Sequence, residues 1–358
     1  MAKHGSKLPL PIQSLLSGVI RSGLALPTLG GLDGVSEFAA ALGRTFGAMS
    51  FNRKRLARAE ENLVEAFPGM DREDRRRLAL GSYAHIFRLG VEFAFMPRLL
   101  NFDGWVRHLT LGDLAPAVKY MLTERPCILI TGHIGNWELI GSAISMLGFP
   151  LHAVYRPLDL KPLDRWVRES RSRQGLTMVS KFGAVGELPQ AIRAGKPLGL
   201  VADQNGGDRG VFVPCFGRLT STYKSIGLMA LQHGATVICG CARRDPAMRR
   251  SGSLGYRMEV TDVFGPEDWD THPDPLFYLT ARYRRAMEGM IRRSPEQYLW
   301  MHRIWRSRPP HERLGKPFPP ALREKMRLLP WMNADDVERV VDRSDRAARE
   351  QPVAPASD

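Results

Sequence analysis

Short apolar runs alternate with amphipathic stretches through the middle of the chain, and this alternation constrains the fold more than any other feature. Four apolar runs have the length and composition of buried strands, at residues 127–131, 153–155, 198–202 and 236–241. Helical patterns separate or follow them, at residues 137–147, 162–174, 185–193 and 222–233. A strand at 256–260 and a long helix at about 275–293 complete the pattern. Such alternation predicts an α/β fold in which a central mixed sheet is flanked by helices.

An interrupted apolar segment precedes this alternating region. Residues 1–50 combine basic side chains with apolar stretches, which Arg21, Pro27 and several glycines break. No uncharged run approaches the roughly 20 residues that a membrane span needs, and no compact apolar run with a cleavage site indicates a signal peptide. We expect residues 14–26 to form a short amphipathic helix that lies in a membrane interface. A loosely packed arm on the main domain would give the same pattern.

Two helical patterns and a polar tail flank the predicted sheet. One helix begins at Asn52 and stops at Pro68, and Asp71 caps the next one. Both helices are expected to form a lid or platform ahead of the main domain rather than part of its core. Residues beyond 332 are polar, which is typical of partial disorder. We divide the chain as follows: an N-terminal membrane-associating segment (1–50), a main domain (51–310) and a polar, partly disordered C-terminal extension (311–358).

The chain is strongly basic. Lys and Arg number 51 against 37 Asp and Glu, which gives a formal net charge of +14. A field of this sign attracts nucleic acid, anionic lipid or an acidic protein, and charge alone does not choose among them. No nucleic-acid-binding motif is recognisable, which favours lipid or protein. The 4 cysteines form no CxxC pair, so we expect neither a disulfide framework nor a metal site.

The segment HIGNWE, which begins at His133, brings two ionisable groups close together in the sequence. The apolar run 127–131 ends just before it, so His133 is expected at the carboxyl end of a strand, where α/β sheets carry their chemistry. The glycines at 132 and 135 permit a tight turn before the next helix. That turn would let Glu138 accept a hydrogen bond from Nδ1 of His133, as in a general base oriented by a carboxylate. Alternatively, Glu138 caps the helix and His133 is an ordinary buried histidine.

Further polar residues follow the predicted strands. Arg156 comes directly after the second apolar run, where a guanidinium can hold a phosphate through two hydrogen bonds. Asp203 follows the third run and is expected to orient Arg156 or a bound acceptor, with a plain loop cap as the alternative. Arg209 lies in the next loop. The hydroxyls of residues 220–222 either face an anion at a helix N-terminus or simply cap that helix.

Five blocks of sequence together resemble the late lipid A acyltransferases, the lauroyl and myristoyl transferases within the lysophospholipid acyltransferase-like superfamily. They are NRKRLARAEENLVEAFP (52–68), HIGNWE (133–138), YRPLD (155–159), LVADQNGGDRGVFVPCFGRLTST (200–222) and PEQYLWMHRIWRSRP (295–309). The H-x4-E spacing is a weak signal by itself, whereas five blocks in order over most of the chain are specific. The resemblance implies a glycerolipid acyltransferase-like fold.

The resemblance also implies a mechanism. His133 would deprotonate an acceptor hydroxyl, with Glu138 as its catalytic partner, and the hydroxyl would attack an acyl thioester directly. Neither an acyl-enzyme nor a cofactor is expected, and the sequence carries no G-x-S-x-G elbow that would supply a serine nucleophile. Substrate binding would fall to Asn136, Arg156, Asp203 and Arg209.

The implied function is transfer of a fatty acyl chain from acyl carrier protein to a hydroxyl of a lipid A precursor. The expected partners are this carrier, an anionic lipid acceptor and the membrane surface, and not nucleic acid. The protein would attach peripherally or monotopically to the cytoplasmic face of the inner membrane. One alternative is a lysophospholipid, glycolipid or aminolipid acceptor, with acyl carrier protein or coenzyme A as the donor. Another is a noncatalytic, basic membrane-binding protein of the same fold, although intact His133, Glu138, Arg156 and Asp203 argue against it.

Overall fold

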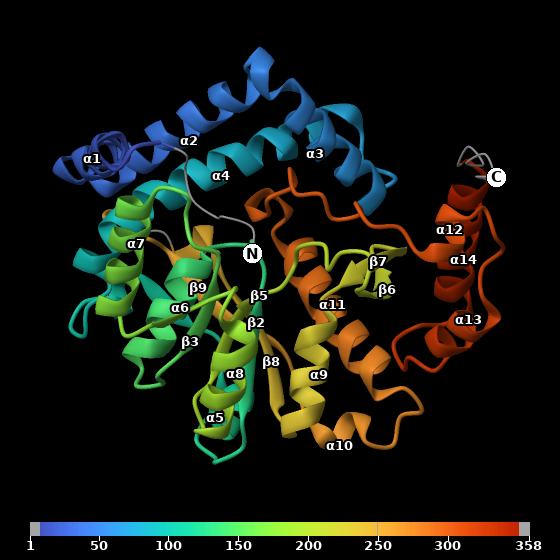
Figure 1. Ribbon diagram of the computed structural model, residues 1–358. Coiled ribbons are helices and arrows are strands. Elements are labelled where there is room, and N and C mark those ends of the chain that lie inside the picture. Colours follow the sequence, from blue (N-terminus) through green and yellow to red (C-terminus); the bar gives the residue numbers. More distant parts are fainter. Residues whose placement is uncertain (1–7, 249, 351–358) are drawn as a thin grey trace.

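A mixed seven-stranded sheet forms the centre of the computed structural model, which describes residues 8–248 and 250–350 (Figure 1). Its strands, in spatial order, are β1 (Leu109–Leu111), β9 (Tyr256–Phe264), β8 (Thr236–Arg244), β2 (Cys127–Thr131), β5 (Leu198–Val201), β3 (His152–Tyr155) and β4 (Thr177–Ser180). The five strands from β8 to β4 run parallel to one another, and β9 runs antiparallel to β8. The fold class predicted from the sequence is confirmed.

Helices cover the sheet and extend the molecule at both ends. The N-terminal group, above the sheet in Figure 1, comprises α1 (Leu10–Ala25), α2 (Leu32–Ala48), α3 (Arg53–Ala66) and α4 (Arg72–Leu99). Those of the α/β region are α5 (Ala115–Met121), α6 (Trp137–Met146), α7 (Lys161–Arg173), α8 (Ala184–Arg193), α9 (Lys224–His233), α10 (Pro266–Trp269) and α11 (Pro275–Arg293). The C-terminal group comprises α12 (Pro310–Arg313), α13 (Pro320–Arg327) and α14 (Ala334–Arg349).

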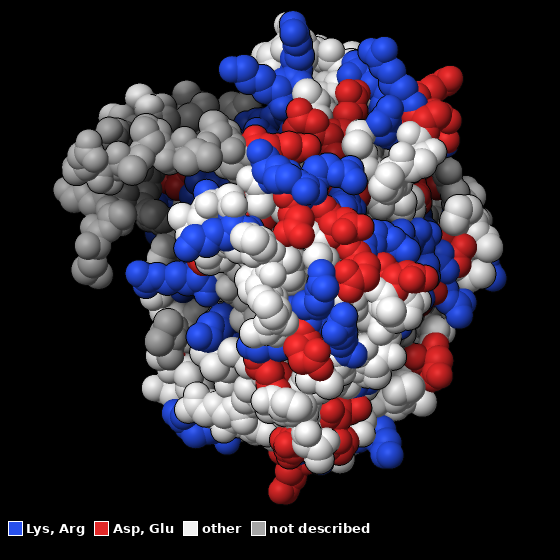
Figure 2. All heavy atoms as spheres, turned by 90° about the vertical axis from the view of Figure 1, so that its right-hand side faces the viewer, with Lys and Arg blue, Asp and Glu red and all other residues white. Residues whose placement is uncertain are grey.

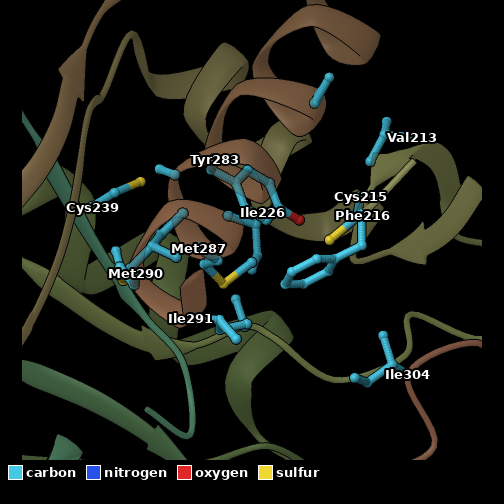
Figure 3. Packing of buried hydrophobic residues seen from close by; sticks show 14 of the residues in the cluster. Val213, Cys215, Phe216, Ile226, Cys239, Tyr283, Met287, Met290, Ile291 and Ile304 are labelled. Atoms are coloured by element: carbon cyan, nitrogen blue, oxygen red, sulfur yellow. The ribbon is translucent and has the colours of Figure 1, made fainter. Parts of the chain in front are cut away.

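The largest hydrophobic core surrounds α11. In Figure 3, Met287 of this helix lies on the side of Phe216, in the turn of a separate two-stranded hairpin, β6 (Val211–Cys215) and β7 (Arg218–Thr222), and Met290 lies on the side of Cys239 in β8. All 4 cysteines are free and buried. Burial raises the pKa of the Cys215 thiol to about 12 and that of Cys127 to about 11, so both thiols stay protonated at neutral pH.

Helices α3 and α4 belong to this core, and our prediction of a separate lid or platform is wrong. Leu56 and Leu63 of α3 and Tyr83 of α4 are buried members of the same cluster. The segment that follows α11 fixes both helices, because Asn62 of α3 donates to the carbonyl of Trp300 at 2.7 Å and Ser82 of α4 donates to that of Tyr298 at 2.6 Å. Helix packing of this kind makes the first two helices of the main domain part of its hydrophobic interior.

Helix α1 presents its apolar side outward. The buried residues of α1 are the polar Gln13 and Ser17, and Gln13 accepts a hydrogen bond from the Lys161 backbone at the start of α7. The apolar residues are exposed instead: Leu10, Ile12, Leu15, Leu16, Val19 and Ile20. Arg21 lies over the ring of Trp166 on α7 at 5.5 Å. None of the helices in the described ranges is long and apolar enough to cross a membrane.

The C-terminal extension folds onto the main domain as far as the structure describes it. Val337, Val340 and Val341 of α14 join the largest core. Arg343 of the same helix donates to the carbonyl of Phe216 in the hairpin at 2.8 Å. The partial disorder expected for residues 311–358 is therefore absent from residues 311–350, whereas residues 351–358, like residues 1–7, lie outside the described part of the chain.

Candidate active site

The loop between β2 and α6 carries His133 and is held from three directions. Ile134 forms an antiparallel bridge with Tyr298, and the backbone nitrogen of Leu299 donates to the carbonyl of His133 at 3.3 Å. The backbone nitrogen of Asn136 donates to the carbonyl of Ala242, at the end of β8, at 2.7 Å. On the third side, His85 of α4 meets the carbonyl of Gly135 at 3.0 Å. These contacts join four distant parts of the chain, so the loop has one defined shape.

Gly135 is required by that shape. Its φ is +57°, in the left-handed region that favours glycine. A Cβ at this position would lie 2.0 Å from the carbonyl oxygen of Ala242, which is too close for any side chain. The glycine that the sequence indicated as a turn residue therefore brings the loop against β8 as well.

Asp203 is the hydrogen-bond partner of His133. Nδ1 of His133 lies 2.8 Å from Oδ1 of Asp203, and the two residues are 70 positions apart. The sheet explains the pairing, because β2 and β5 are parallel neighbours in which Thr131 stands opposite Val201. Continuing both strands by two residues brings His133 and Asp203 side by side at the same edge. The loops at the carboxyl ends of neighbouring parallel strands thus bring an imidazole and a carboxylate together.

The surroundings favour the charged form of both members of this pair. Burial opposes a positive charge on His133, but Asp203, through its charge and its hydrogen bond, and more weakly Glu138 outweigh this effect and raise the histidine pKa. Burial likewise opposes the charge of Asp203, whose side chain is 1% exposed, yet His133 and His302 hold its pKa well below the ordinary range. An ionised carboxylate only accepts hydrogen bonds. Nδ1 of His133 therefore carries the proton, and Nε2 offers a lone pair.

Glu138 does not accept the hydrogen bond that we predicted for it. Its two oxygens bind Arg171 of α7, with Nε at 2.9 Å and Nη2 at 2.6 Å. Asn136 caps α6, since its Oδ1 accepts from the nitrogen of Leu139 at 2.9 Å. Glu138 therefore sits on the first helical turn and binds α7, and its effect on His133 acts through space. The catalytic role assigned to it stays a prediction.

An apolar cavity begins beside His133. About 860 Å³ of space, part of it continuous with solvent, lies between the sheet and helices α5 and α6. Thr131 at the end of β2 and Trp137 at the start of α6 line it, and the Trp137 ring centroid is 4.9 Å from that of His133. The other lining residues include Ile140, Ile144 and Met121, and nearly all residues that line the cavity are hydrophobic. His133 thus stands next to a cavity of the kind that suits a hydrocarbon chain.

The other predicted binding residues differ in their surroundings. Asn136 is 1% exposed and donates to Glu92 of α4 at 3.0 Å, so its contacts in the structure hold the loop in place. Arg156 is exposed directly after the carboxyl end of β3, and Arg209 is exposed in the loop between β5 and β6. No hydrogen bond or ion pair within the described ranges engages either guanidinium, so Asp203 does not orient Arg156 as expected. Their roles in binding substrate stay predictions.

The hydroxyls of residues 220–222 do not form the anion site or the helix cap that the sequence allowed. They belong to β7, where Thr220, Ser221 and Thr222 are fully buried. Their hydroxyls donate to backbone carbonyls, that of Thr222 to Thr220 at 3.1 Å. The next helix, α9, begins after Tyr223 and has no side-chain cap. The segment before α9, which we expected to be a loop, is instead part of a hairpin whose turn lies at residues 216–217.

Comparison with known proteins agrees with this geometry. Residues 14–307 match the model of a family described as bacterial lipid A biosynthesis acyltransferase. The chain belongs to this family. It is 28% identical over 280 residues to the lipid A biosynthesis palmitoleoyltransferase of Escherichia coli K12, which covers 75% of this chain and 85% of that protein. It is 24% identical over 270 residues to the lauroyltransferase of the same strain, covering 73% and 82%. A lipid A biosynthesis acyltransferase of Haemophilus influenzae is 25% identical over 272 residues, covering 75% and 82%.

This chain is therefore an acyltransferase, as the sequence predicted, and its site contains a residue that sequence reasoning missed. The ring of His302 lies edge-on to that of His133, with centroids 4.7 Å apart and an interplanar angle of 87°. Its Nδ1 is 3.8 Å from Oδ2 of Asp203. The signal was present, because His302 lies in the block PEQYLWMHRIWRSRP, but nothing in the sequence showed that this block returns to the loop of His133.

His133, Asp203 and His302 are also of the residue types that bind metal ions, and their nearest ligand atoms lie within 4.8 Å of one another. The 2.8 Å contact between Nδ1 of His133 and Oδ1 of Asp203 is a hydrogen bond. Because this bond joins an imidazole to a buried carboxylate, as in a general base and its orienting group, we interpret the cluster as acid–base machinery.

Proposed function

We propose that this acyltransferase moves a fatty acyl chain from acyl carrier protein to a hydroxyl of a lipid A precursor, at the cytoplasmic face of the inner membrane. The observation that supports this most directly is the position of His133, which is hydrogen-bonded to Asp203 and stands at one end of an apolar cavity. A hydrocarbon chain in that cavity would bring its thioester carbonyl to the histidine.

The geometry supports direct transfer. Nε2 of His133 would accept the proton of the acceptor hydroxyl while that oxygen forms a bond to the thioester carbonyl carbon. Collapse of the tetrahedral intermediate breaks the carbon–sulfur bond, and the imidazolium returns its proton to the leaving thiolate. Asp203 stabilises the imidazolium between these two steps. Each buried cysteine thiol is held protonated, which argues against a cysteine nucleophile.

The acceptor is proposed to bind through its phosphates. Arg156 is exposed directly after β3, and Arg209 is exposed in the loop that also carries Asp203; no described side chain neutralises either of them. Guanidinium groups bind phosphate oxygens through paired hydrogen bonds. A phosphorylated glycolipid would therefore be held with a hydroxyl near Nε2. The basic balance of the chain, +14, also suits an acidic carrier protein as the donor.

The reversed polarity of α1 supports membrane attachment. Its two buried residues, Gln13 and Ser17, are polar, whereas Leu15 and Val19 are 69% and 63% exposed. Exposed apolar faces of this kind are typical of helices that lie in the membrane interface. A hydrophobic surface on α1 would place the protein where a lipid acceptor is found.

A reconstituted transfer assay tests the function. The purified chain in detergent is offered acyl donors of 12, 14 and 16 carbons (about the range of membrane acyl chains) on acyl carrier protein or coenzyme A. The acceptors are an under-acylated lipid A precursor and a lysophospholipid, and products are identified by mass spectrometry. We expect the precursor to gain one acyl chain from the carrier protein. Exclusive acylation of the lysophospholipid would overturn the acceptor, and exclusive use of coenzyme A would overturn the donor.

A further inference from the structure

His302 has an unassigned contact with the catalytic pair. One oxygen of Asp203, Oδ1, is bound by His133, whereas the other, Oδ2, is buried without a hydrogen-bond partner among the described residues. Nδ1 of His302 is also buried and likewise lacks a partner there. These two atoms face each other at 3.8 Å. A buried carboxylate oxygen is costly to leave unpaired, and the nearest unpaired nitrogen belongs to this histidine.

The position of His302 is set by the fold and not by the pair itself. Its carbonyl accepts from the Asn62 side chain of α3 at 2.7 Å, and its backbone nitrogen donates to Leu299 at 3.1 Å. Leu299 in turn donates to the carbonyl of His133. The backbone therefore places the two imidazoles at a defined distance, with the ring of one against the edge of the other.

We propose that His302 is a positioning residue for acyl transfer: it donates a hydrogen bond from Nδ1 to Oδ2 of Asp203 and so fixes the carboxylate with Oδ1 on His133. This inference rests on the proposed function of His133 as the base. The two atoms need to approach by less than about 1 Å to reach a normal hydrogen-bond length. Contacts of catalytic groups commonly tighten in this way when substrate is bound.

Asp203 has other polar neighbours besides His302. Arg284 of α11 binds the backbone carbonyl of Asp203 at 2.7 Å, which is not the carboxylate. Tyr223, ahead of α9, and Tyr298 both interact electrostatically with Asp203. The Tyr298 hydroxyl is buried without a partner among the described residues, so it is the competing donor. A variant of each residue separates the two possibilities.

The test compares two substitutions, each of which keeps only one of two properties of the imidazole, its ring packing or its hydrogen-bond donor. His302→Phe keeps the ring packing against His133 but removes the donor, whereas His302→Asn keeps an N–H donor close to the position of Nδ1 but removes the ring. We expect His302→Phe to lower kcat by about 10- to 100-fold, the effect of one lost hydrogen bond to a charged group, with the donor KM unchanged. His302→Asn should retain kcat within about threefold, because one neutral donor replaces another. A purely structural role predicts the opposite order and would overturn the inference.

Two controls and a second readout complete the experiment. His311→Phe changes a buried histidine that binds Ser344 at 2.8 Å in the C-terminal extension, and it should leave kcat unchanged. If Tyr298→Phe reproduces the kcat loss while His302→Phe does not, the donor is Tyr298 and the inference fails. The rate at which diethyl pyrocarbonate modifies His133, followed by mass spectrometry against pH, needs no substrate. The midpoint of this pH dependence should move to higher pH in His302→Phe, because the unpaired carboxylate raises the pKa of His133 further. In His302→Asn the midpoint should lie at the wild-type value again.

The two readouts distinguish the possible failures. An inactive wild-type protein with the expected diethyl pyrocarbonate midpoints would reject the proposed function and keep the contact between His302 and Asp203. An active wild-type protein whose midpoint is unchanged, or lower, in His302→Phe would reject the role of His302 alone.

Discussion

Asp203 stays ionised in an almost fully buried position because two imidazoles face its two oxygens. Burial of a lone carboxylate would favour its protonated form. The charge retained here raises the pKa of His133 and fixes its Nδ1 proton, so we infer that Asp203 acts on catalysis through the histidine. Glu138 contributes to the same field from a greater distance while it holds Arg171.

Substitutions at these carboxylates should therefore have unequal effects. Asp203→Asn places an amide donor on Nδ1, which forces the proton of His133 onto Nε2 and removes the base. We expect kcat to fall by about 10²- to 10⁴-fold, as in His133→Ala. Glu138→Gln should lower kcat by less than about tenfold and the free energy of unfolding by about 1 kcal/mol, since the amide oxygen still accepts from Arg171. Steady-state kinetics and thermal unfolding of the three variants measure both quantities. A larger kcat loss in Glu138→Gln than in Asp203→Asn would restore Glu138 as the direct partner.

The pH dependence of kcat follows from the raised pKa of His133. The base must be neutral, so activity is lost as the pH falls through this pKa, which lies above the ordinary value of 6.5. Glu138→Gln removes the smaller of the two carboxylate charges that raise it, so the acid limb of the profile should move to lower pH while catalysis persists. A profile measured between pH 5 and 9, about the range in which such a histidine titrates, tests this. An acid limb that stays in place would show that Glu138 has no electrostatic effect on the base.

At the scale of elements, the loop that carries His133 depends on close contact with β8. Gly135→Ala introduces a side chain at φ +57° and 2.0 Å from the carbonyl oxygen of Ala242, so the loop has to move. Gly148→Ala is the matched control, because its φ is +95° but no atom lies within 4 Å of the added Cβ. The control should cost about 1–2 kcal/mol of stability from backbone strain alone. Gly135→Ala should cost more and should also lower kcat at least about tenfold, since a displacement of about 1 Å is enough for such losses. Equal thermal stability and equal activity of the two variants would contradict the assigned role of the contact.

The cavity is bounded by α5, and this boundary should limit the acyl chain. Met121 lines the cavity near the start of β2, whereas His133 follows the end of that strand. Met121→Trp should therefore shift donor preference towards shorter chains, because each methylene kept from an apolar site loses about 0.8 kcal/mol. The neighbouring Leu122 is 74% exposed, so Leu122→Trp is the control and should leave preference unchanged. Competition between donors of different length gives the ratio directly. An unaltered ratio in Met121→Trp would place the acyl chain elsewhere.

The sequence allowed most elements to be predicted but not how they pair. The strand before His133 and the strand before Asp203 were both recognisable from their apolar runs. Their adjacency was not, because β3 and β4 lie between β2 and β5 in the chain, whereas β2 and β5 are neighbours in the sheet. Glu138 was chosen for its nearness in sequence, and the competing partner Arg171 belongs to another helix. Long-range packing decides which of the two carboxylates pairs with His133, and the spacing of residues within one segment carries no information about such packing.

The prediction of disorder in the C-terminal extension was wrong for a different reason. Its polar composition was taken to indicate disorder, yet Val337, Val340 and Val341 follow the spacing of one helical face. Asn333 and Asp336 form a capping box at the start of α14. A narrow apolar stripe was sufficient because the hairpin and α3 supply the other side of the interface, including Glu65, which binds Arg343. Average polarity over a long segment hid this short periodic signal.

At the scale of the whole molecule, the net charge of +14 has to be compared with where the charged side chains lie. Figure 2 views the side on which α12, α13 and α14 lie in Figure 1, and basic and acidic side chains interleave there. Ion pairs account for part of this pattern, among them Arg323 with Glu338 and Arg339 with Asp336. A surface of mixed charge has weak attraction for an anionic membrane. We therefore expect attachment to depend on the α1 end of the molecule.

Membrane binding should thus be lost when the outward face of α1 becomes polar. Leu15→Asp with Val19→Asp removes two exposed apolar side chains, each worth roughly 1.5–3 kcal/mol if buried in lipid. Partition onto vesicles that contain anionic lipid should fall by more than about 100-fold, whereas Leu122→Asp, also at an exposed position, should bind as wild type. High salt should release the wild-type protein only in part, because salt screens the basic charges but not the apolar contact. Transfer to a detergent-dispersed acceptor should persist in the double variant, since α1 contributes no residue to the His133 pair or to the cavity. Vesicle binding that survives the double substitution, or that high salt abolishes entirely, would show that charge alone holds the protein to the membrane.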